Sequence, residues 1–388
     1  MINRRKFFKI LAASGIGVAL SPVFDKPIFG ADDNKTKKPA TNIKDALKYA
    51  RTKNSMPGMF PGKVVQVIHN NSTKDKKVVF TAADLMVSQA MLNLTEAKDI
   101  TEAWRMFFTP EEKIGLKVNP IAGPELTTSV EIVKAIIQQL EKAGIPRKNL
   151  VIFDRRSEDL KKSGFTAENF PEVQITSTEQ QDSSGSYYDK DGKLYSEQMI
   201  DKDWYYWADV EEKYDAETIP YMVNEGKFSY FSKIVTKQVD KIINIPVLKN
   251  AGASVTLAMK NLAFGLITNT SRLHKDLWSE TCAEVCAFPP IRDKVVLNIV
   301  DGIIGCFQGG PGYSPQFIAE YKTVLASTDP VAIDRIGYEI VIKKRIEEKV
   351  QKQDSPRGRS FMEIAQNLGL GTCDLEKIKL KKIDVTQL

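Results

Sequence analysis

The sequence of 388 residues predicts an α/β protein with a mainly parallel or mixed sheet and helices on both faces. Three observations predict this fold. Strand-like and helix-like runs alternate after residue 60. The strand-like runs are largely apolar, as expected of strands that helices cover on both faces. Residues 129–143 have the periodicity of an amphipathic helix and end at Gly144, a residue typical of helix C-termini.

The individual elements follow from the same patterns. The predicted strands are 63–68, 113–118, 150–153, 241–248, 294–300 and 322–326. The predicted helices are 82–94, 129–143, 254–264 and 330–344. Asp329 precedes the last helix as an expected N-cap, and Pro330 stands at its first position, where a missing N–H costs nothing.

Residues 182–217 interrupt this alternation with a polar, acidic and aromatic insertion that contains Trp204-Tyr205-Tyr206-Trp207. Two interpretations stay open. The aromatic side chains form a lid that stacks on a ligand, or the insertion folds a small aromatic core against the main body. Residues 189–193 form a turn and lack the spacing of a calcium loop.

The N-terminus resembles a twin-arginine export signal. Arg4 and Arg5 are followed by an aromatic residue, a lysine and an apolar run over 10–20 that is too short to span a bilayer, which takes about 20 residues. We therefore expect residues 1–31 to direct the folded protein, through the twin-arginine machinery, to the periplasm or another extracytoplasmic location. Cleavage is expected after Ala31. An uncleaved anchor and an ordinary amphipathic helix are the alternatives.

Residues 32–60 are expected to be a polar tether, and residues 61–388 the α/β domain. The whole chain has a formal net charge of +6. Residues 1–31 hold five basic residues and one acidic residue, so the remainder carries only +2. This near balance gives no support to a nucleic-acid-binding function. No later segment is long and apolar enough to be a transmembrane helix in the mature chain.

Polar residues stand at the ends of the predicted strands, where open α/β sheets bind ligands. They are Lys117 with Asn119, Asp154, Lys249 and Asp301. We expect these side chains to ring one edge of the sheet. The alternative for each residue alone is that it caps a helix or fixes a turn.

Residues 249–265 carry the strongest ligand-binding signal. Small residues at 251–254 allow a backbone to approach a ligand closely, and a predicted helix follows. Thr256 and Lys260 would lie on one face of that helix, with Asn261 beside them. A helix N-terminus with nearby lysines suits a small anion. The spacings of a P-loop and of a dinucleotide-binding glycine motif are both absent.

His274 and Arg272 stand in a polar stretch after this helix. His274 is a candidate general base or metal ligand, and the alternative is a hydrogen-bonded surface histidine. Asp154, Asp301 and Asp329 with one histidine would suit a divalent metal such as magnesium, manganese or iron, although nothing in the spacing requires one. The metal and any other cofactor therefore stay unknown.

Four cysteines are too few for a disulfide scaffold, and their spacing disfavours an iron–sulfur cluster. Buried thiols or a long-range disulfide are the better interpretation. The four are Cys282, Cys286, Cys306 and Cys373.

Several motifs together resemble the family catalogued as domain of unknown function 362, over about residues 60–345. They are Gly115-Leu116-Lys117-Val118-Asn119, Ile245-Pro246-Val247-Leu248-Lys249, Thr256 through Lys260-Asn261 and Gly265, Arg272 and His274, Asp301-Gly302, Gly309-Gly310-Pro311-Gly312, and Asp329-Pro330-Val331-Ala332-Ile333-Asp334. The family includes exported members with twin-arginine signals, so the resemblance implies export for this chain as well. Some relatives carry a ferredoxin-like cluster domain, whose cysteines this chain lacks. Many relatives place a histidine after the lysine that corresponds to Lys249, so its role is lost here or has moved to His274.

The sequence thus favours an exported enzyme that acts on a small anionic ligand. The ligand would bind in a cleft at the C-terminal ends of the strands. The alternative is a non-catalytic ligand-binding or cofactor-carrying protein of the periplasm that uses this cleft. The anion would be held by Lys117, Asn119, Lys249, Thr256, Lys260, Asn261 and Arg272, and acid–base or metal-binding groups would come from Asp154, His274 and Asp301.

Overall fold

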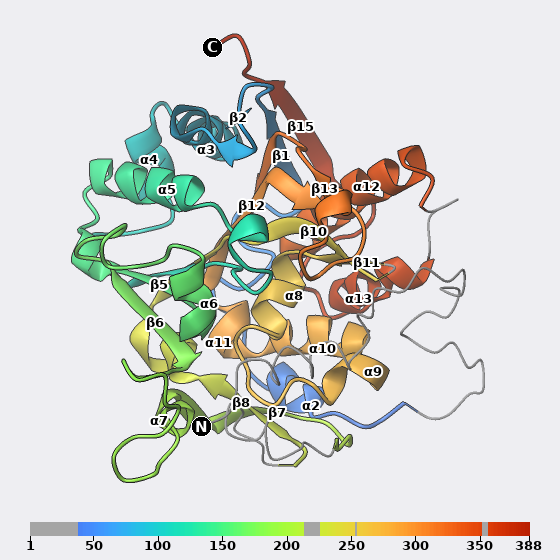
Figure 1. Ribbon diagram of the computed structural model, residues 1–388. Coiled ribbons are helices and arrows are strands. Elements are labelled where there is room, and N and C mark those ends of the chain that lie inside the picture. Colours follow the sequence, from blue (N-terminus) through green and yellow to red (C-terminus); the bar gives the residue numbers. More distant parts are fainter. Residues whose placement is uncertain (1–37, 213–225, 253, 351–355) are drawn as a thin grey trace. The chain divides into compact units, whose positions relative to one another are not determined.

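A computed structural model describes residues 38–212, 226–252, 254–350 and 356–388, and its arrangement is shown in Figure 1. The expected export signal at residues 1–31 lies outside the described residues, as do parts of the predicted tether and of the aromatic insertion. Within the described residues, no helix combines the length and the hydropathy needed to cross a membrane.

One mixed sheet of eleven strands organises the described chain, which confirms the α/β fold. Its main path runs β15-β1-β14-β12-β9-β4-β5-β6, and β10, β11 and β13 extend it beside β12. The strands are β1 (Lys63–Ile68), β4 (Ile114–Lys117), β5 (Leu150–Arg156), β6 (Gln174–Glu179), β9 (Lys241–Asn244), β10 (Val247–Ala251), β11 (Ser254–Thr256), β12 (Val295–Cys306), β13 (Ile318–Ala319), β14 (Thr323–Ser327) and β15 (Lys379–Asp384). Pairs β4–β5, β4–β9, β5–β6 and β9–β12 are parallel, whereas β14 is antiparallel to both of its neighbours.

Helices cover both faces of this sheet, and each layer has its own apolar core (Figure 1). One core holds residues of α3 (Phe80–Thr95), α4 (Ile100–Arg105), α5 (Val130–Lys142) and α6 (Ser157–Lys162). The other holds residues of α8 (Ala258–Ala263), α9 (Leu273–Asp276), α10 (Trp278–Glu284), α11 (Pro289–Arg292), α12 (Pro330–Glu347) and α13 (Pro356–Asn367). Alternation along each strand explains the two cores, because neighbouring residues point to opposite faces.

The remaining elements are short. They are α2 (Ile43–Leu47), α7 (Tyr195–Met199), β2 (Thr73–Lys74), β3 (Lys77–Val78), β7 (Ile200–Trp207), β8 (Phe228–Ser232) and the tight or irregular helical turns η1 (Pro124–Leu126), η2 (Arg147–Asn149), η4 (Ile234–Gln238), η5 (Val285–Ala287) and η6 (Pro315–Phe317).

Two predicted elements were wrong around the candidate site. The strand expected at 241–248 is two strands, β9 and β10, separated at Pro246, which cannot donate to a ladder. The helix expected at 254–264 is the strand β11 followed by the six-residue helix α8. Val255 and Thr256 are β-branched and pair back onto β10, with Gly252 at φ 56° in the turn between the strands.

The aromatic insertion is part of the domain wall within its described residues. Strand β7 pairs with β8 outside the main sheet. Tyr206 is fully buried, its ring packs edge-on against Phe288, and its hydroxyl donates to Glu284 at 2.8 Å. This placement agrees with a small aromatic core against the main body and not with a lid formed by this tyrosine.

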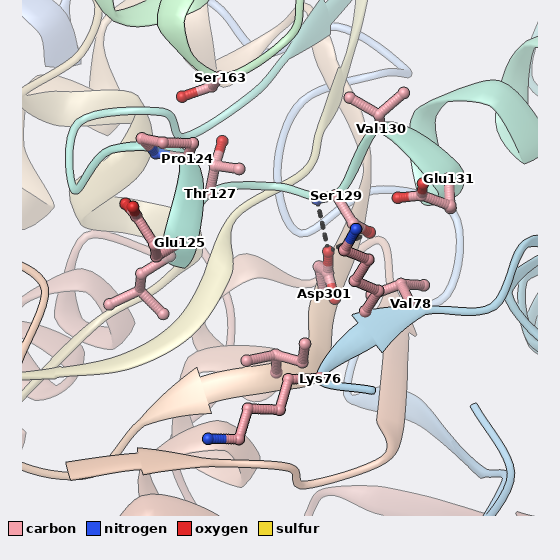
Figure 2. A pocket seen from close by; sticks show the side chains of 13 residues that line it. Lys76, Val78, Pro124, Glu125, Thr127, Ser129, Val130, Glu131, Ser163 and Asp301 are labelled. Carbon is pink, nitrogen blue, oxygen red and sulfur yellow. Dashed lines mark hydrogen bonds between the residues drawn. The ribbon is translucent and has the colours of Figure 1, made fainter. Parts of the chain in front are cut away.

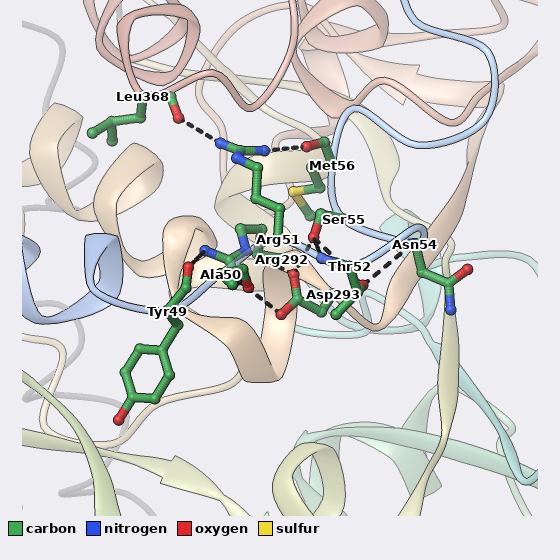
Figure 3. Close-up of polar contacts among 10 residues, drawn as sticks. All are labelled: Tyr49, Ala50, Arg51, Thr52, Asn54, Ser55, Met56, Arg292, Asp293 and Leu368. Atoms are coloured by element: carbon green, nitrogen blue, oxygen red, sulfur yellow. Dashed lines mark hydrogen bonds and ion pairs between the residues drawn. The ribbon is translucent and has the colours of Figure 1, made fainter.

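The segment expected as a tether packs on the domain from residue 41 onward. Thr41 bridges to Ala208, and Met56 is fully buried. Figure 3 shows two arginines that fasten this segment: Arg292 donates to the carbonyls of Tyr49 and Ala50, at 3.2 and 2.8 Å, and Arg51 donates to those of Met56 and Leu368, at 2.6 and 2.8 Å. Residues 41–60 are therefore a structured N-terminal part of the domain.

Candidate functional site: a buried lysine cluster

Lys117 ends β4 and is fully buried on the face covered by α8. Its ammonium group donates to the Asp154 carboxylate, to the Val118 carbonyl at 2.8 Å and to the Asn261 amide oxygen at 3.0 Å. Burial lowers the pKa of Lys117, and the charge of Asp154 opposes that effect. Because an ammonium group has three donors, these three acceptors saturate Lys117.

Amide side chains continue this network across the sheet. The Asn261 oxygen also accepts from the Asn119 amide at 2.7 Å. The Asn261 amide donates to Asn244 at 2.8 Å, and Asn244 donates to Asn298 at 2.9 Å. The network thus joins the C-terminal ends of β4 and β9 to α8 and β12. The network holds Asn119 and Asn261 beside Lys117 and Asp154, in agreement with the expectation that these residues lie together.

Lys249 lies in β10 and is also fully buried. Its ammonium nitrogen has no hydrogen-bond partner among the residues that the structure describes. Burial, followed by the charge of Lys260, lowers the pKa of Lys249 to about 7, while Asp154 acts in the opposite direction. Lys249 therefore lies close enough to Lys260 and Asp154 to feel their charges. We call Lys117, Asp154, Lys249 and Lys260 the lysine cluster.

Lys260 lies in α8 and is held by aromatic rings. Its ammonium is 5.7 Å from the ring centre of Phe264 and 5.6 Å from that of Trp278, which are cation–π distances. Among the residues that the structure describes, no carboxylate forms an ion pair with Lys260. Lys260 is buried, with 8% of its surface exposed, whereas the neighbouring His274 is partly exposed.

His274 belongs to α9 and lies near Lys260 of α8. Burial, followed by the charge of Lys260, lowers the pKa of His274 to about 4, so the imidazole is neutral at pH 7. Its Nδ1 lies 3.0 Å from the Thr270 carbonyl, which can only accept, so Nδ1 carries the proton and Nε2 is the free base. The structure therefore brings His274 to the cluster as a weak base or hydrogen-bond acceptor.

Arg155 joins this side of the site, although the sequence did not single it out beyond its place after Asp154. Its guanidinium donates to Glu179 and to the Thr270 hydroxyl, both at 2.6 Å. The second terminal nitrogen, Nη2, is buried and has no partner in the described parts of the chain. The signal that could have identified Arg155 is its position at the end of a buried parallel strand.

The amides at the start of α8 are not available to a ligand. Asp334, in α12, accepts from the backbone N–H of Ala258 at 2.6 Å and from that of Met259 at 3.0 Å. Burial raises the pKa of Asp334 to about 8. The anion expected at this helix N-terminus is thus replaced by a side chain of the protein itself, and any ligand must use side-chain donors.

Asp301 does not join the lysine cluster. It faces the α5 layer with Ile299 and Ile303, and accepts from the backbone N–H and hydroxyl of Ser129 at 2.8 and 2.7 Å. Burial raises its pKa, and Glu131 is the nearby charge that adds to this effect. The expectation of one common rim was wrong for Asp301, because alternation along β12 directs it away from Asn298, whose amide belongs to the network.

Asp301 instead lines a cavity of about 250 Å³ beside the start of α5, shown in Figure 2. None of the predicted ligand-binding lysines lines it. Its walls come from the β2–β3 hairpin, η1 and β12, and the charged residues around it are Lys76, Lys77, Glu125, Glu131 and Asp301.

Two further predicted ligand residues have other positions than expected. Thr256 is in β11, directly opposite Lys249, and not on a helix face with Lys260. Arg272 is 2% exposed and donates to the carbonyls of Ala208, Val210 and Lys227 at 2.8–3.1 Å. It therefore fastens the ends of the paired strands β7 and β8, and these donors are not directed at a ligand.

The aspartates suggested for a metal are separated. Asp154 pairs with Lys117, Asp301 with Ser129, and Asp329 caps α12 by accepting from Val331 and Ala332. Among the described residues, no three His, Cys, Asp or Glu side chains gather as metal ligands. All four cysteines are buried and free.

Unpartnered donors outnumber acceptors around the lysine cluster. Among the buried polar atoms without a partner in the described chain are four on residues of this region: Lys249 Nζ, Arg155 Nη2, Thr256 Oγ1 and Asn119 Oδ1. Lysine and arginine nitrogens can only donate, a hydroxyl can do both, and an amide oxygen can only accept. A ligand with acceptor oxygens and negative charge would satisfy most of these atoms.

Comparisons with known proteins agree with the sequence motifs. The family model described as Domain of unknown function (DUF362) matches residues 114–339, which confirms the resemblance. A crystal structure of a Thermotoga maritima protein, a structural genomics target, is 7% identical with a TM-score of 0.35. That alignment covers 71% of this chain and 60% of the Thermotoga chain. A search of curated proteins finds no match.

Proposed function

We propose that this chain, which belongs to the domain of unknown function 362 family, binds a small anionic ligand at the lysine cluster. The observation that carries the proposal is Lys249, a fully buried ammonium without a hydrogen-bond partner in the described chain. A buried cation without compensation is costly, and an anion supplies both charge and acceptors.

Lys249 and Lys260 hold the ligand in this proposal, and Arg155 Nη2 is a further donor. Lys117 has a different task, because its three donors are occupied. It orients Asn261 and balances Asp154. The neutral His274 stands at the more exposed side, where its Nε2 can accept a hydrogen bond from the ligand.

We further propose that the protein is an exported enzyme, with a non-catalytic carrier of the same ligand as the alternative. The pKa of Lys249, about 7, supports the enzyme, because a group with such a pKa exchanges protons readily at physiological pH. The imidazole of His274, whose pKa is about 4, is neutral at this pH and serves as a hydrogen-bond acceptor for the reacting ligand. Turnover that His274→Gln abolishes without loss of ligand affinity supports an enzyme, whereas tight binding without turnover supports a carrier.

Calorimetric titration tests the binding step directly. The probes are inorganic phosphate, oxalate and lactate at pH 6.5, with wild type, Lys249→Met and Lys260→Met. Hydrogen bonds to charged groups contribute about 1.5–3 kcal/mol, so each variant should bind about ten- to a hundredfold more weakly. Lys343→Met is the matched control, since its side chain is 79% exposed on α12. Equal affinities in all four proteins would rule out the lysine cluster as the anion site.

A further inference from the structure

Strand pairing gives Lys249 two defined neighbours. It lies opposite Thr256 in the antiparallel pair β10–β11 and beside Cys306 in the parallel pair β10–β12. Register partners point to the same face of a sheet, so the amine is flanked by a hydroxyl and a thiol. The Thr256 hydroxyl has no partner in the described chain, and the Cys306 thiol donates to the Gln308 carbonyl at 2.8 Å.

These surroundings favour a neutral amine. No carboxylate forms an ion pair with Lys249 among the described residues, and a second lysine lies nearby. With a pKa of about 7, about half of the Lys249 side chains are uncharged at pH 7, against fewer than about one in a thousand for an ordinary lysine. Desolvation and a neighbouring cation are the two conditions that turn a lysine into a nucleophile.

We propose that Lys249 forms an imine with a small oxo acid, an anion that carries an aldehyde or ketone group. This inference rests on the proposed anion site and names the class of its ligand. The geometry that supports it is the unpartnered amine between Thr256 and Cys306, with Lys260 close by to hold the carboxylate.

The reaction conserves atoms and electrons without a further reagent. The nitrogen lone pair of neutral Lys249 attacks the carbonyl carbon, the C=O π electrons move to oxygen, and a proton passes from nitrogen to that oxygen. The hydroxyl group then leaves as water together with the one proton that remains on nitrogen, and the electron pair of that N–H bond forms the C=N bond of a neutral imine. The Thr256 hydroxyl can donate a hydrogen bond to the carbonyl oxygen during the attack.

Reductive trapping tests the covalent step on the wild-type protein. The full chain is incubated at pH 7 with glyoxylate and sodium cyanoborohydride, which reduces the C=N bond to a stable secondary amine. Intact mass spectrometry should show one adduct, and peptide mapping should place it on Lys249. Lactate, an anion without an aldehyde or ketone group, should slow the labelling by occupying the site. Lys249→Arg, which keeps the charge, should lose the adduct, with Lys343→Arg as control.

The outcomes separate this inference from the anion site. An adduct on Lys249 that lactate suppresses supports both. Lactate binding with no adduct on Lys249, or with adducts spread over exposed lysines, overturns the imine and leaves the anion site standing. Absence of both lactate binding and an adduct overturns both. Because the mapping uses wild-type protein, a misfolded Lys249→Arg variant does not affect this decision.

Discussion

At the residue scale, Lys249 links stability to pH. Its pKa is about 7 in the folded protein and near 10.5 when unfolded, so between these values the unfolded chain binds the additional proton. Stability therefore rises with pH through this window. The groups around it act in different directions: Lys260 and Lys117 lower its pKa, and Asp154 and Cys306 raise it.

We expect Lys249→Met to be more stable than wild type below pH 7, because methionine needs no counter-charge. The pKa difference sets a ceiling of roughly 5 kcal/mol on this gain. The gain should shrink as pH rises from about 7 to 10, because wild-type Lys249 releases its proton on folding in this range and that release costs less at higher pH. Urea unfolding of both proteins across this range measures the gap. A gap that is constant with pH would contradict the buried, unpartnered ammonium.

At the element scale, α8 depends on α12 for its first turn. The Asp334 carboxyl group satisfies two amides that the six-residue helix cannot pair itself. We expect Asp334→Ala to lower the free energy of unfolding by about 2–4 kcal/mol, since it leaves two buried N–H groups unpaired. Asp334→Asn should lose less, because its amide oxygen still accepts. Thermal and urea unfolding give the values.

Glu339→Ala is the matched control on the same helix. Glu339 is 43% exposed and forms an ion pair with Arg335 in the adjacent turn, so its removal should cost at most about 0.5 kcal/mol. Equal losses for Asp334→Ala and Glu339→Ala would show that the α8 amides do not depend on Asp334.

Strand β12 separates two polar sites by alternation alone. Asn298 belongs to the amide network, and Asp301 caps the start of α5 through Ser129. We expect Asp301→Asn to lower the free energy of unfolding by about 1–2 kcal/mol, the usual value of a helix cap, and to leave anion affinity unchanged. Calorimetry on the folded variant measures the affinity. A loss as large as that of Lys249→Met would place Asp301 in the lysine cluster after all.

The same elements show what the sequence could predict. Periodicity identified α5, and the apolar runs identified β4 and β5, so Lys117, Asn119 and Asp154 were correctly placed together. The sequence pattern could not show which face of the sheet Asp301 occupies, because that depends on how β12 is aligned with its neighbouring strands.

Long-range pairing explains the other differences between expectation and structure. Thr256 is in a strand because Val255 and Thr256 can pair with β10, a contact that helix periodicity does not reveal. The role of Arg272 depends on carbonyls more than forty residues away in the chain.

At the scale of the whole molecule, the first and last strands lie side by side. Strand β1 pairs in parallel with β15, from Lys63 beside Lys379 to Ile68 beside Asp384. This edge of the sheet can therefore form only after β15 has been synthesised. The lysine cluster has a similar dependence, since it joins β4 and β5 to β10 and α8. Such non-local pairing forms slowly and leaves incomplete intermediates exposed.

This topology makes the proposed export route consistent with the fold, because the twin-arginine machinery carries proteins that have already folded. We expect the double variant Arg4→Lys, Arg5→Lys to remain in the cytoplasm of a bacterium with this machinery, although its charge and apolar run are unchanged. Immunoblots of periplasmic and cytoplasmic fractions measure the distribution, with Lys9→Arg as a matched control that keeps both arginines. Unchanged periplasmic accumulation of the double variant would contradict the route.

Gly115→Trp gives a second test of the export route, because a Cβ at this position would lie 2.7 Å from the ring of Phe153 and the larger side chain should disrupt β4. A misfolded chain should be retained in the cytoplasm by the folding requirement of this route, whereas a route for unfolded chains would still export it.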